Sequence, residues 1–234
     1  MRLKVKVIGC GGIGSCIIPV LCKMVAFNTK YEESEITFID GDKYEERNKE
    51  RQNFIKIGPK AGVTRELYEN QYPNVEFYNF NDFLNETNAV KYIRENDVVF
   101  GCVDNHTTRK LLSQRCKDIK NVLLISGGNE FTDGALQVYY RKNNVELTRP
   151  LDNEDHPEIS NPQDKHPEVV LREAGCDVKA LQGSPQLLVT NNLVAAHMLC
   201  VFQSYLDERL EKSKIEKVYV DVLSNDARAV KTGE

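Results

Sequence analysis

The chain has 234 residues, of which 41% are hydrophobic, and this is enough to bury the core of one α/β domain. Its 31 basic and 35 acidic side chains give a formal charge of −4 without a long block of one sign, which argues against non-specific binding to nucleic acid. The N-terminus lacks a signal-peptide pattern, and polar residues interrupt the apolar run at 187–202. We therefore expect no membrane span and a soluble, cytoplasmic protein.

The first half of the sequence alternates strand and helix patterns. Residues 3–9 are predicted to form a strand that ends in glycine, and residues 12–27 a helix with apolar residues at helical spacing. Further strands are predicted at 36–39, 75–78, 97–102 and 122–126, and helices at 61–70, 88–95 and 106–118, while 43–53 is irregular or a short helix. This alternation predicts a Rossmann-like, mostly parallel sheet with helices on both faces.

The pattern changes after Gly127. Residues 135–140 and 145–147 are typical of antiparallel strands, and 149–166 is predicted to be a long surface loop. The longest helix is predicted at 185–210, followed by strands at 217–223 and 228–230. We predict a single domain over 1–234, with a nucleotide-binding part at 1–126 and an antiparallel extension, crossover loop and long helix at 127–234.

The seven cysteines form an odd set without any C-x-x-C pair, so reduced thiols are expected. Six of them lie in apolar or helical contexts and are predicted to be small buried hydrophobes. A structural zinc ion needs four suitable ligands, and His156, His166 and Cys176 are too widely spaced to supply them. No zinc is predicted.

A glycine-rich loop follows the first predicted strand. Gly9, Gly11, Gly12 and Gly14 stand in G-C-G-G-I-G and open the first helix, where N–H groups and the helix dipole favour phosphate. Asp40 ends the next strand, where a carboxylate can bind ribose hydroxyls. The motif predicts a nucleotide site without separating NAD from ATP; alternatively, the glycines only permit tight packing of helix on sheet.

Polar groups that suit a triphosphate follow this motif. They are Asp42, Asn48, Arg51, Gln52 and Lys60, together with Asp104 at the end of a later strand. Amide, guanidinium and ammonium groups bind phosphate, and a carboxylate such as Asp104 can hold Mg²⁺. Each residue alone also has a structural explanation. Asp42, Arg51 and Lys60 could be ordinary surface charges, Asn48 a turn residue, and Asp104 the cap of the following helix. Their combination favours ATP.

The motifs G-C-G-G-I-G, D-G-D, N-K-E-R-Q, G-P-K and C-V-D-N, in this order, resemble the ThiF/MoeB superfamily, which includes the activating enzymes of ubiquitin-like proteins. The resemblance covers nearly the whole chain. Many relatives hold zinc with two C-x-x-C pairs, so this chain resembles a small zinc-free member.

The resemblance implies roles for individual residues. The glycines shape the nucleotide loop, Asp40 binds ribose, and Asp42, Asn48 and Gln52 belong to the nucleotide site. Lys60 contacts the phosphates, and Asp104 binds Mg²⁺. Arg51 is similar to the arginine that family homodimers supply across the subunit interface. The implied cofactors are ATP and Mg²⁺, and the implied partner is a small ubiquitin-like carrier protein or peptide with a flexible C-terminal tail.

Cys176 lies near the position where some relatives place a cysteine that accepts the activated acyl group as a thioester. The alternative is a thiol without a catalytic role.

The expected function is ATP-dependent adenylation of the C-terminal carboxylate of such a carrier, giving an acyl-adenylate and pyrophosphate, with Cys176 as a candidate acceptor. One alternative is an NAD(P)-dependent oxidoreductase, although the sequence contains no Tyr-x-x-x-Lys pattern to supply a proton donor. The other is a non-catalytic nucleotide-binding scaffold.

Overall fold

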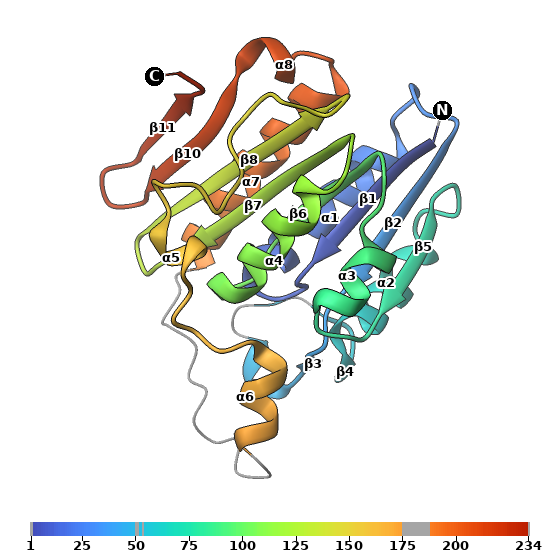
Figure 1. Cartoon of the computed structure of the whole chain (residues 1–234). Coiled ribbons are helices and arrows are strands. Elements are labelled where there is room, and N and C mark those ends of the chain that lie inside the picture. The colour runs from blue at the N-terminus through green and yellow to red at the C-terminus, as the bar shows by residue number, and fades with distance from the viewer. Residues whose placement is uncertain (1, 50–51, 53, 175–187, 234) are drawn as a thin grey trace.

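The computed structural model describes residues 2–49, 52, 54–174 and 188–233. Its central sheet contains five parallel strands: β1 (Arg2–Ile8), β2 (Glu33–Ile39), β5 (Glu76–Phe80), β6 (Asp97–Gly101) and β7 (Val122–Asn129). Four antiparallel strands extend it: β8 (Asp133–Lys142), β9 (Val145–Glu146), β10 (Ile215–Asp221) and β11 (Asp226–Lys231). The order is β11-β10-β8-β7-β6-β1-β2-β5, with β9 paired to β8 (Figure 1). The predicted Rossmann-like fold with an antiparallel extension is confirmed.

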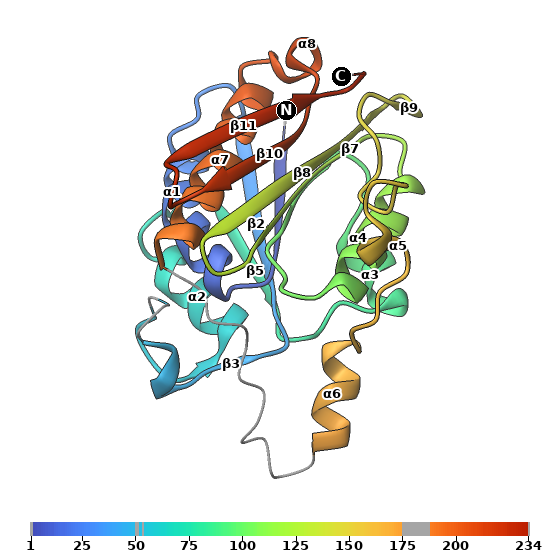
Figure 2. The same ribbon diagram turned by 90° about the vertical axis from the view of Figure 1, so that its left-hand side faces the viewer.

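Helices cover both faces of the sheet (Figures 1 and 2). On one face lie α1 (Gly12–Ala26), α2 (Lys60–Glu69) and α7 (Leu188–Leu206), and on the other α3 (Glu86–Tyr92), α4 (His106–Lys117) and α5 (Pro157–Ser160). The larger core lies under α1 and α7, where the rings of Phe100 and Phe202 meet edge to face with centroids 5.5 Å apart. The smaller core lies under α3 and α4 and contains Ile8, Ile39 and Val99.

The segment 149–166 differs from the predicted surface loop. Leu151 and Ile159 are buried, and α5 forms within the segment. Two side chains of α4 hold it, since Lys117 pairs with Asp152 at 2.7 Å and the Ser113 hydroxyl accepts the N–H of Leu151 at 3.0 Å. Two isolated apolar residues form no helical or strand periodicity, so the packing of this segment against α4 could not be predicted from the sequence pattern.

Several helix boundaries also differ. α3 begins at Glu86 instead of 88, because the Asn85 side chain accepts the N–H groups of Thr87 and Asn88. α7 ends at Leu206 instead of 210, and Glu208 then adopts a left-handed φ of +57° before the short α8 (Leu210–Ser213). The predicted start of that helix, at 185–187, lies outside the described residues. α6 (Pro167–Ala174) was not predicted; in both views it lies beyond the carboxyl ends of the parallel strands (Figures 1 and 2).

Four of the cysteines are buried as predicted. The prediction is wrong for Cys200, which is exposed, and Cys16 is only partly buried. Within the part of the chain that the structure describes, no helix combines the length and the hydrophobicity that crossing a membrane requires.

Candidate nucleotide-binding site

The glycine loop joins β1 to α1 at the carboxyl end of the sheet. Gly9 has a φ of +94°, and a Cβ there would lie 2.6 Å from the carbonyl oxygen of Cys102. A Cβ on Gly14 would lie 2.1 Å from the carbonyl oxygen of Gly9. These two glycines therefore allow the loop to pack against the end of β6 and against its own helix, as the packing alternative proposed.

Gly11 faces polar side chains instead. A Cβ at this position would lie 3.8 Å from Nε2 of Gln52 and 3.9 Å from Nζ of Lys60. The adjoining N-terminus of α1 begins at Gly12 and has no acidic residue in its first turn. Free N–H groups and a cation at the same place suit a phosphate group.

Asp40 connects the loop to β2. Its Oδ2 accepts the N–H of Cys10 at 2.6 Å, and its Oδ1 accepts the N–H of Asp42 at 2.8 Å. Burial raises the pKa of Asp40, and the neighbouring Asp42 adds to this effect, while Lys60 opposes it. Each carboxylate oxygen has a second lone pair, so Asp40 can still accept a hydrogen bond from a ribose hydroxyl.

Lys60 is brought to the loop by a small ribbon, in which β3 (Lys43–Tyr44) pairs with β4 (Gly58–Pro59). The residue is 7% exposed, and its Nζ lies 3.1 Å from Oδ2 of Asp42. Burial acts to lower the pKa of Lys60, but the carboxylates of Asp40 and Asp42 outweigh burial and hold the pKa above its ordinary value. The ammonium is therefore charged at neutral pH.

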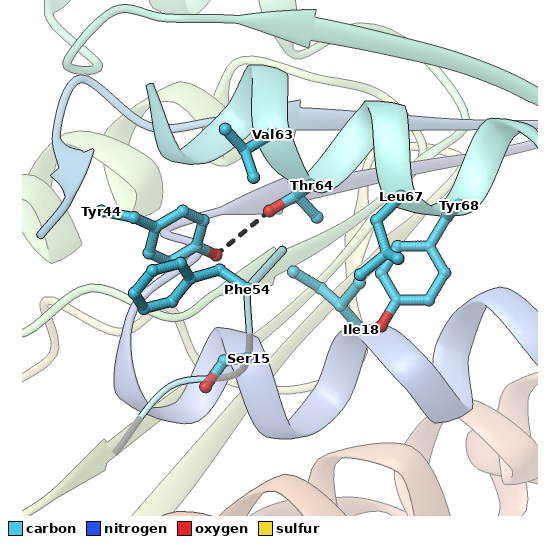
Figure 3. Close-up of a pocket in the computed structure, with 8 residues that line it drawn as sticks. All are labelled: Ser15, Ile18, Tyr44, Phe54, Val63, Thr64, Leu67 and Tyr68. Carbon is cyan, nitrogen blue, oxygen red and sulfur yellow. Dashed lines mark hydrogen bonds between the residues drawn. The ribbon is translucent and has the colours of Figure 1, made fainter. Parts of the chain in front are cut away.

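A small pocket between α1 and α2 supports this ribbon (Figure 3). The Tyr44 hydroxyl donates to the carbonyl of Cys10 at 3.0 Å and lies 3.1 Å from the Thr64 hydroxyl. The Tyr44 ring stacks on Phe54 with centroids 4.5 Å apart. These contacts fix the segment after Asp40 against the glycine loop.

Three predicted residues are not brought to the loop by the described contacts. Asn48 ends the 3₁₀ helix η1 (Glu46–Asn48), and its Oδ1 accepts the N–H of Glu45 at 2.8 Å, as the turn alternative proposed. Its carbonyl accepts the N–H of Gln52 at 2.9 Å, so it helps to place that side chain. Arg51 and Cys176 lie outside the described residues.

Asp104 is exposed just beyond β6. The N–H of Cys102 donates to the carbonyl of Ile8 at 2.8 Å, and two residues of extended chain span at most about 7 Å. Asp104 thus lies close to the glycine loop. The capping alternative is wrong, because Asn105 accepts the N–H of Thr108. Within the described residues, the Asp104 carboxylate has no hydrogen bond or ion pair.

The sequence matches the ThiF family over residues 1–230. The chain belongs to the ThiF family. It is 31% identical over 149 residues to "Adenylyltransferase and sulfurtransferase MOCS3" of Drosophila ananassae, a match that covers 59% of this chain and 31% of that protein. It is 29% identical over 149 residues to "Adenylyltransferase and sulfurtransferase uba4" of Pyricularia oryzae, covering 59% and 28%. The chain thus spans less than a third of these curated relatives.

Solved structures share the fold of this ThiF-family chain. E. coli MccB with ATP superposes with a TM-score of 0.71 at 17% identity, over 99% of this chain and 64% of that one. PaaA superposes with a TM-score of 0.68 at 16% identity, over 98% and 72%.

Arg109 was not among the predicted site residues, although its guanidinium interacts with Asp104. Its Nη2 donates to the carbonyls of Val103 at 3.1 Å and Gly127 at 3.3 Å, and its buried Nε has no partner among the described residues. Burial lowers its pKa, and the nearby Asp104 opposes this. A Cβ on Gly128 would lie 2.2 Å from Nη2, so that glycine makes room for the guanidinium. No local sequence pattern marked Arg109, because its position beside Gly128 depends on how β6 and β7 pair.

Within 2–49, 52, 54–174 and 188–233, no three His, Cys, Asp or Glu side chains are grouped to hold a metal ion. Asp104 offers a single exposed carboxylate. One carboxylate suits Mg²⁺, which takes its remaining ligands from water and from substrate phosphates.

Proposed function

We propose that this ThiF-family chain is an adenylyltransferase that uses ATP to activate the C-terminal carboxylate of a small ubiquitin-like protein or peptide. The observation that carries the proposal is the placement of the Lys60 ammonium beside Gly11 and Asp40, at the N-terminus of α1. The curated relatives named above carry the name adenylyltransferase, and MccB structures include one with ATP and one with the peptide MccA.

The cationic groups of the site would bring two negatively charged reactants together. A carboxylate and a triphosphate are both anions, so bringing them together is the main difficulty. Lys60 remains charged because Asp40 and Asp42 flank it, and Arg51 would add a guanidinium. Asp104 would hold Mg²⁺, which neutralises phosphate charge when bound. Positioning and charge stabilisation carry such phosphoryl chemistry, so no general base is needed.

In the proposed reaction, a carboxylate oxygen of the partner's tail attacks the α-phosphorus of ATP. A new oxygen–phosphorus bond forms, and the bond from the α-phosphorus to the bridging oxygen breaks, releasing pyrophosphate. The acyl group then passes from the adenylate to an acceptor, and AMP leaves. Cys176 is a candidate acceptor, because its thiolate would attack the acyl carbon and form a thioester as the bond to AMP breaks. We further propose a cytoplasmic homodimer in which Arg51 acts across the subunit interface.

The test is ATP–pyrophosphate exchange with peptides that end in glycine. Exchange is expected with a free C-terminal carboxylate and absent with the same peptide amidated. Asp104→Ala should reduce exchange by ~100-fold or more, because one removed charge-stabilising group typically costs this much. Asp118→Ala is the matched control, since Asp118 is an exposed aspartate at the other end of α4.

Calorimetry with ATP and with NAD completes the test. ATP should bind with Mg²⁺ present, and NAD should not. Tight binding of NAD without ATP binding would support the oxidoreductase instead, and ATP binding without exchange for any peptide would support a scaffold. Full exchange activity in Asp104→Ala would refute the role of that carboxylate.

A further inference from the structure

The first half of β1 is polar on one face. Val5 and Val7 point into the core under α1, whereas Lys4 and Lys6 alternate with them and share a face with Ile8. A parallel strand that is covered on both faces is apolar throughout. The two lysines therefore mark a part of the sheet that α3 and α4 leave uncovered.

The neighbouring strands continue this polar surface. The register places Lys4 between Glu35 on β2 and Asp97 on β6, and it places Lys6 beside Thr37 on β2. In Figure 1, no helix of the described chain lies in front of the first halves of β1 and β2. This surface lies away from the nucleotide loop, because five residues of strand separate Lys4 from Gly9, about 16 Å.

A cavity of about 220 Å³ occupies this surface. Its lining residues come from four strands and the end of α3; they are Lys4, Lys6, Glu35, Thr37, Tyr78, Phe80, Lys91, Tyr92, Arg94 and Asp97. Pockets that hold drug-sized ligands measure roughly 300–1,000 Å³, so this smaller cavity suits a small metabolite.

The floor of the cavity contains buried polar groups. Lys6 is 7% exposed, and its Nζ donates to Glu35 at 2.5 Å and to the Thr37 hydroxyl at 3.0 Å. Asp97 is 1% exposed; its Oδ2 accepts the N–H of Arg94 at 2.7 Å, but its buried Oδ1 has no partner in the described part of the chain. A buried acceptor without a donor is costly, and a ligand hydroxyl would relieve that cost.

The rim carries unpaired positive charge. Lys4, Lys91 and Arg94 form no ion pair with any described residue, and the only side-chain hydrogen bond among them runs from Nε of Arg94 to the carbonyl of Lys91. The lining therefore has four cationic side chains against two carboxylates, an excess of two positive charges. A phosphate monoester carries about −1.5 to −2 at neutral pH and would balance this excess.

Aromatic rings complete one wall. Phe80 and Tyr92 stack with centroids 4.0 Å apart, and Tyr78 and Phe80 are exposed on β5. The hydroxyls of Tyr78 and Tyr92 are bound to Glu76 and Asp82, so their rings, and not their hydroxyls, are free to contact the carbon atoms of a ligand.

We propose that this cavity binds a small phosphate monoester that carries hydroxyl groups, at a site separate from the nucleotide loop. Lys4, Lys91 and Arg94 bind the phosphate, and Oδ1 of Asp97 accepts a ligand hydroxyl. The aromatic wall contacts the ligand's carbon skeleton.

The test is calorimetric titration of the full chain with glycerol 3-phosphate and with inorganic phosphate. Glycerol 3-phosphate should bind at least ~10-fold more tightly, because only it carries alcohol hydroxyl groups on a carbon skeleton that can reach Asp97 while its phosphate contacts the cations. Changing both Lys91→Gln and Arg94→Gln should weaken its binding by ~10-fold or more, since two charge-assisted hydrogen bonds are lost. Both side chains are exposed near the end of α3, so the fold should survive, and circular dichroism checks this.

Two controls decide whether the site is separate. Lys212→Gln, an exposed lysine on α8, should leave binding unchanged. Lys60→Met should also leave it unchanged, because Lys60 belongs to the nucleotide loop. The proposal would be overturned if glycerol 3-phosphate binding disappeared in Lys60→Met but persisted in the Lys91→Gln, Arg94→Gln double variant. It would also be overturned if neither glycerol 3-phosphate nor inorganic phosphate bound to the unmodified chain. Equal affinity for the two probes would overturn the role of Asp97.

Discussion

At the scale of single residues, the charge balance around Lys60 determines both stability and phosphate binding. The ammonium lies between Asp40, which is partly buried, and Asp42, whose side chain is half exposed. Lys60→Met would leave the Asp40 carboxylate without its cation. We expect the free energy of unfolding to fall by about 1–2 kcal/mol at pH 7, less than for a fully buried pair, because solvent screens Asp42. Urea unfolding measures this.

The loss of stability in Lys60→Met should depend on pH, and its direction follows from the pKa of Asp40. The folded-state pKa of Asp40 is already raised, and removal of Lys60 raises it further. The folded variant then binds a proton more tightly than the unfolded chain, so the stability deficit should shrink as pH falls toward that raised pKa. Asp42→Asn, which removes the exposed partner, should cost less than about 1 kcal/mol. A deficit that grows on acidification would contradict this account.

Asp97 offers a second titration at the opposite end of the sheet. Burial raises its pKa to about 6, while Lys6 acts to lower it. An acid with a raised folded-state pKa stabilises the fold when protonated, so its effect is lost as pH rises between about 4 and 6. Asn cannot titrate and can still accept the N–H of Arg94.

We therefore expect Asp97→Asn to gain stability relative to the unmodified chain, by about 2–3 kcal/mol between pH 4 and pH 7. Denaturant unfolding at several pH values gives this difference, and comparison at each pH cancels the other titrating groups. A difference that stays constant over this range would mean that Asp97 ionises normally.

At the scale of elements, the start of α4 depends on a residue from a distant segment. Asp164 accepts the N–H of His106 at 2.5 Å and that of Thr107 at 3.0 Å, and the Thr107 hydroxyl donates to it at 2.7 Å. Burial acts to raise the pKa of Asp164, but these hydrogen bonds outweigh it and lower the pKa. The carboxylate is therefore charged at neutral pH and also complements the helix dipole.

Asp164→Ala should lower the free energy of unfolding by about 1 kcal/mol at pH 7. Because the lowered pKa stabilises the fold only while Asp164 is ionised, this difference should vanish as the pH falls through that pKa. Asp118→Ala, at the other end of the same helix, is the control and should have little effect. Equal losses in both variants would show that Asp164 is not a specific cap.

At the scale of the whole molecule, the sequence indicated most of the fold but only part of the site. Buried parallel strands are continuous apolar runs, so β6 and β7 were predictable. β1 followed from its alternating valines and from the glycine loop after it, and Asp40 followed from its place after β2. The docking of Leu151 was not predictable, because it depends on Ser113 and Lys117 from another element.

In the nucleotide-binding site, too, local features were predictable and features that depend on distant elements were not. The tight packing of Gly9 and Gly14 is local and could be predicted from the motif. The position of Arg109 under Gly128 depends on how β6 and β7 pair, which no local pattern records. Arg51 and Cys176 stay predictions, because they lie outside the described residues.

The proposed homodimer leads to a prediction about subunit mixing. If Arg51 acts in the partner's site, Arg51→Ala and Asp104→Ala each inactivate both sites of a homodimer. A mixed dimer then contains one site with an intact Asp104 and an arginine from its partner. Random mixing gives half mixed dimers, so exchange activity should recover to about a quarter of the unmodified level. Refolding the two variants together and measuring pyrophosphate exchange tests this; recovery should be absent when each variant is refolded alone. If activity stays at the level of the separate variants while native mass spectrometry shows mixed dimers, then Arg51 serves its own subunit.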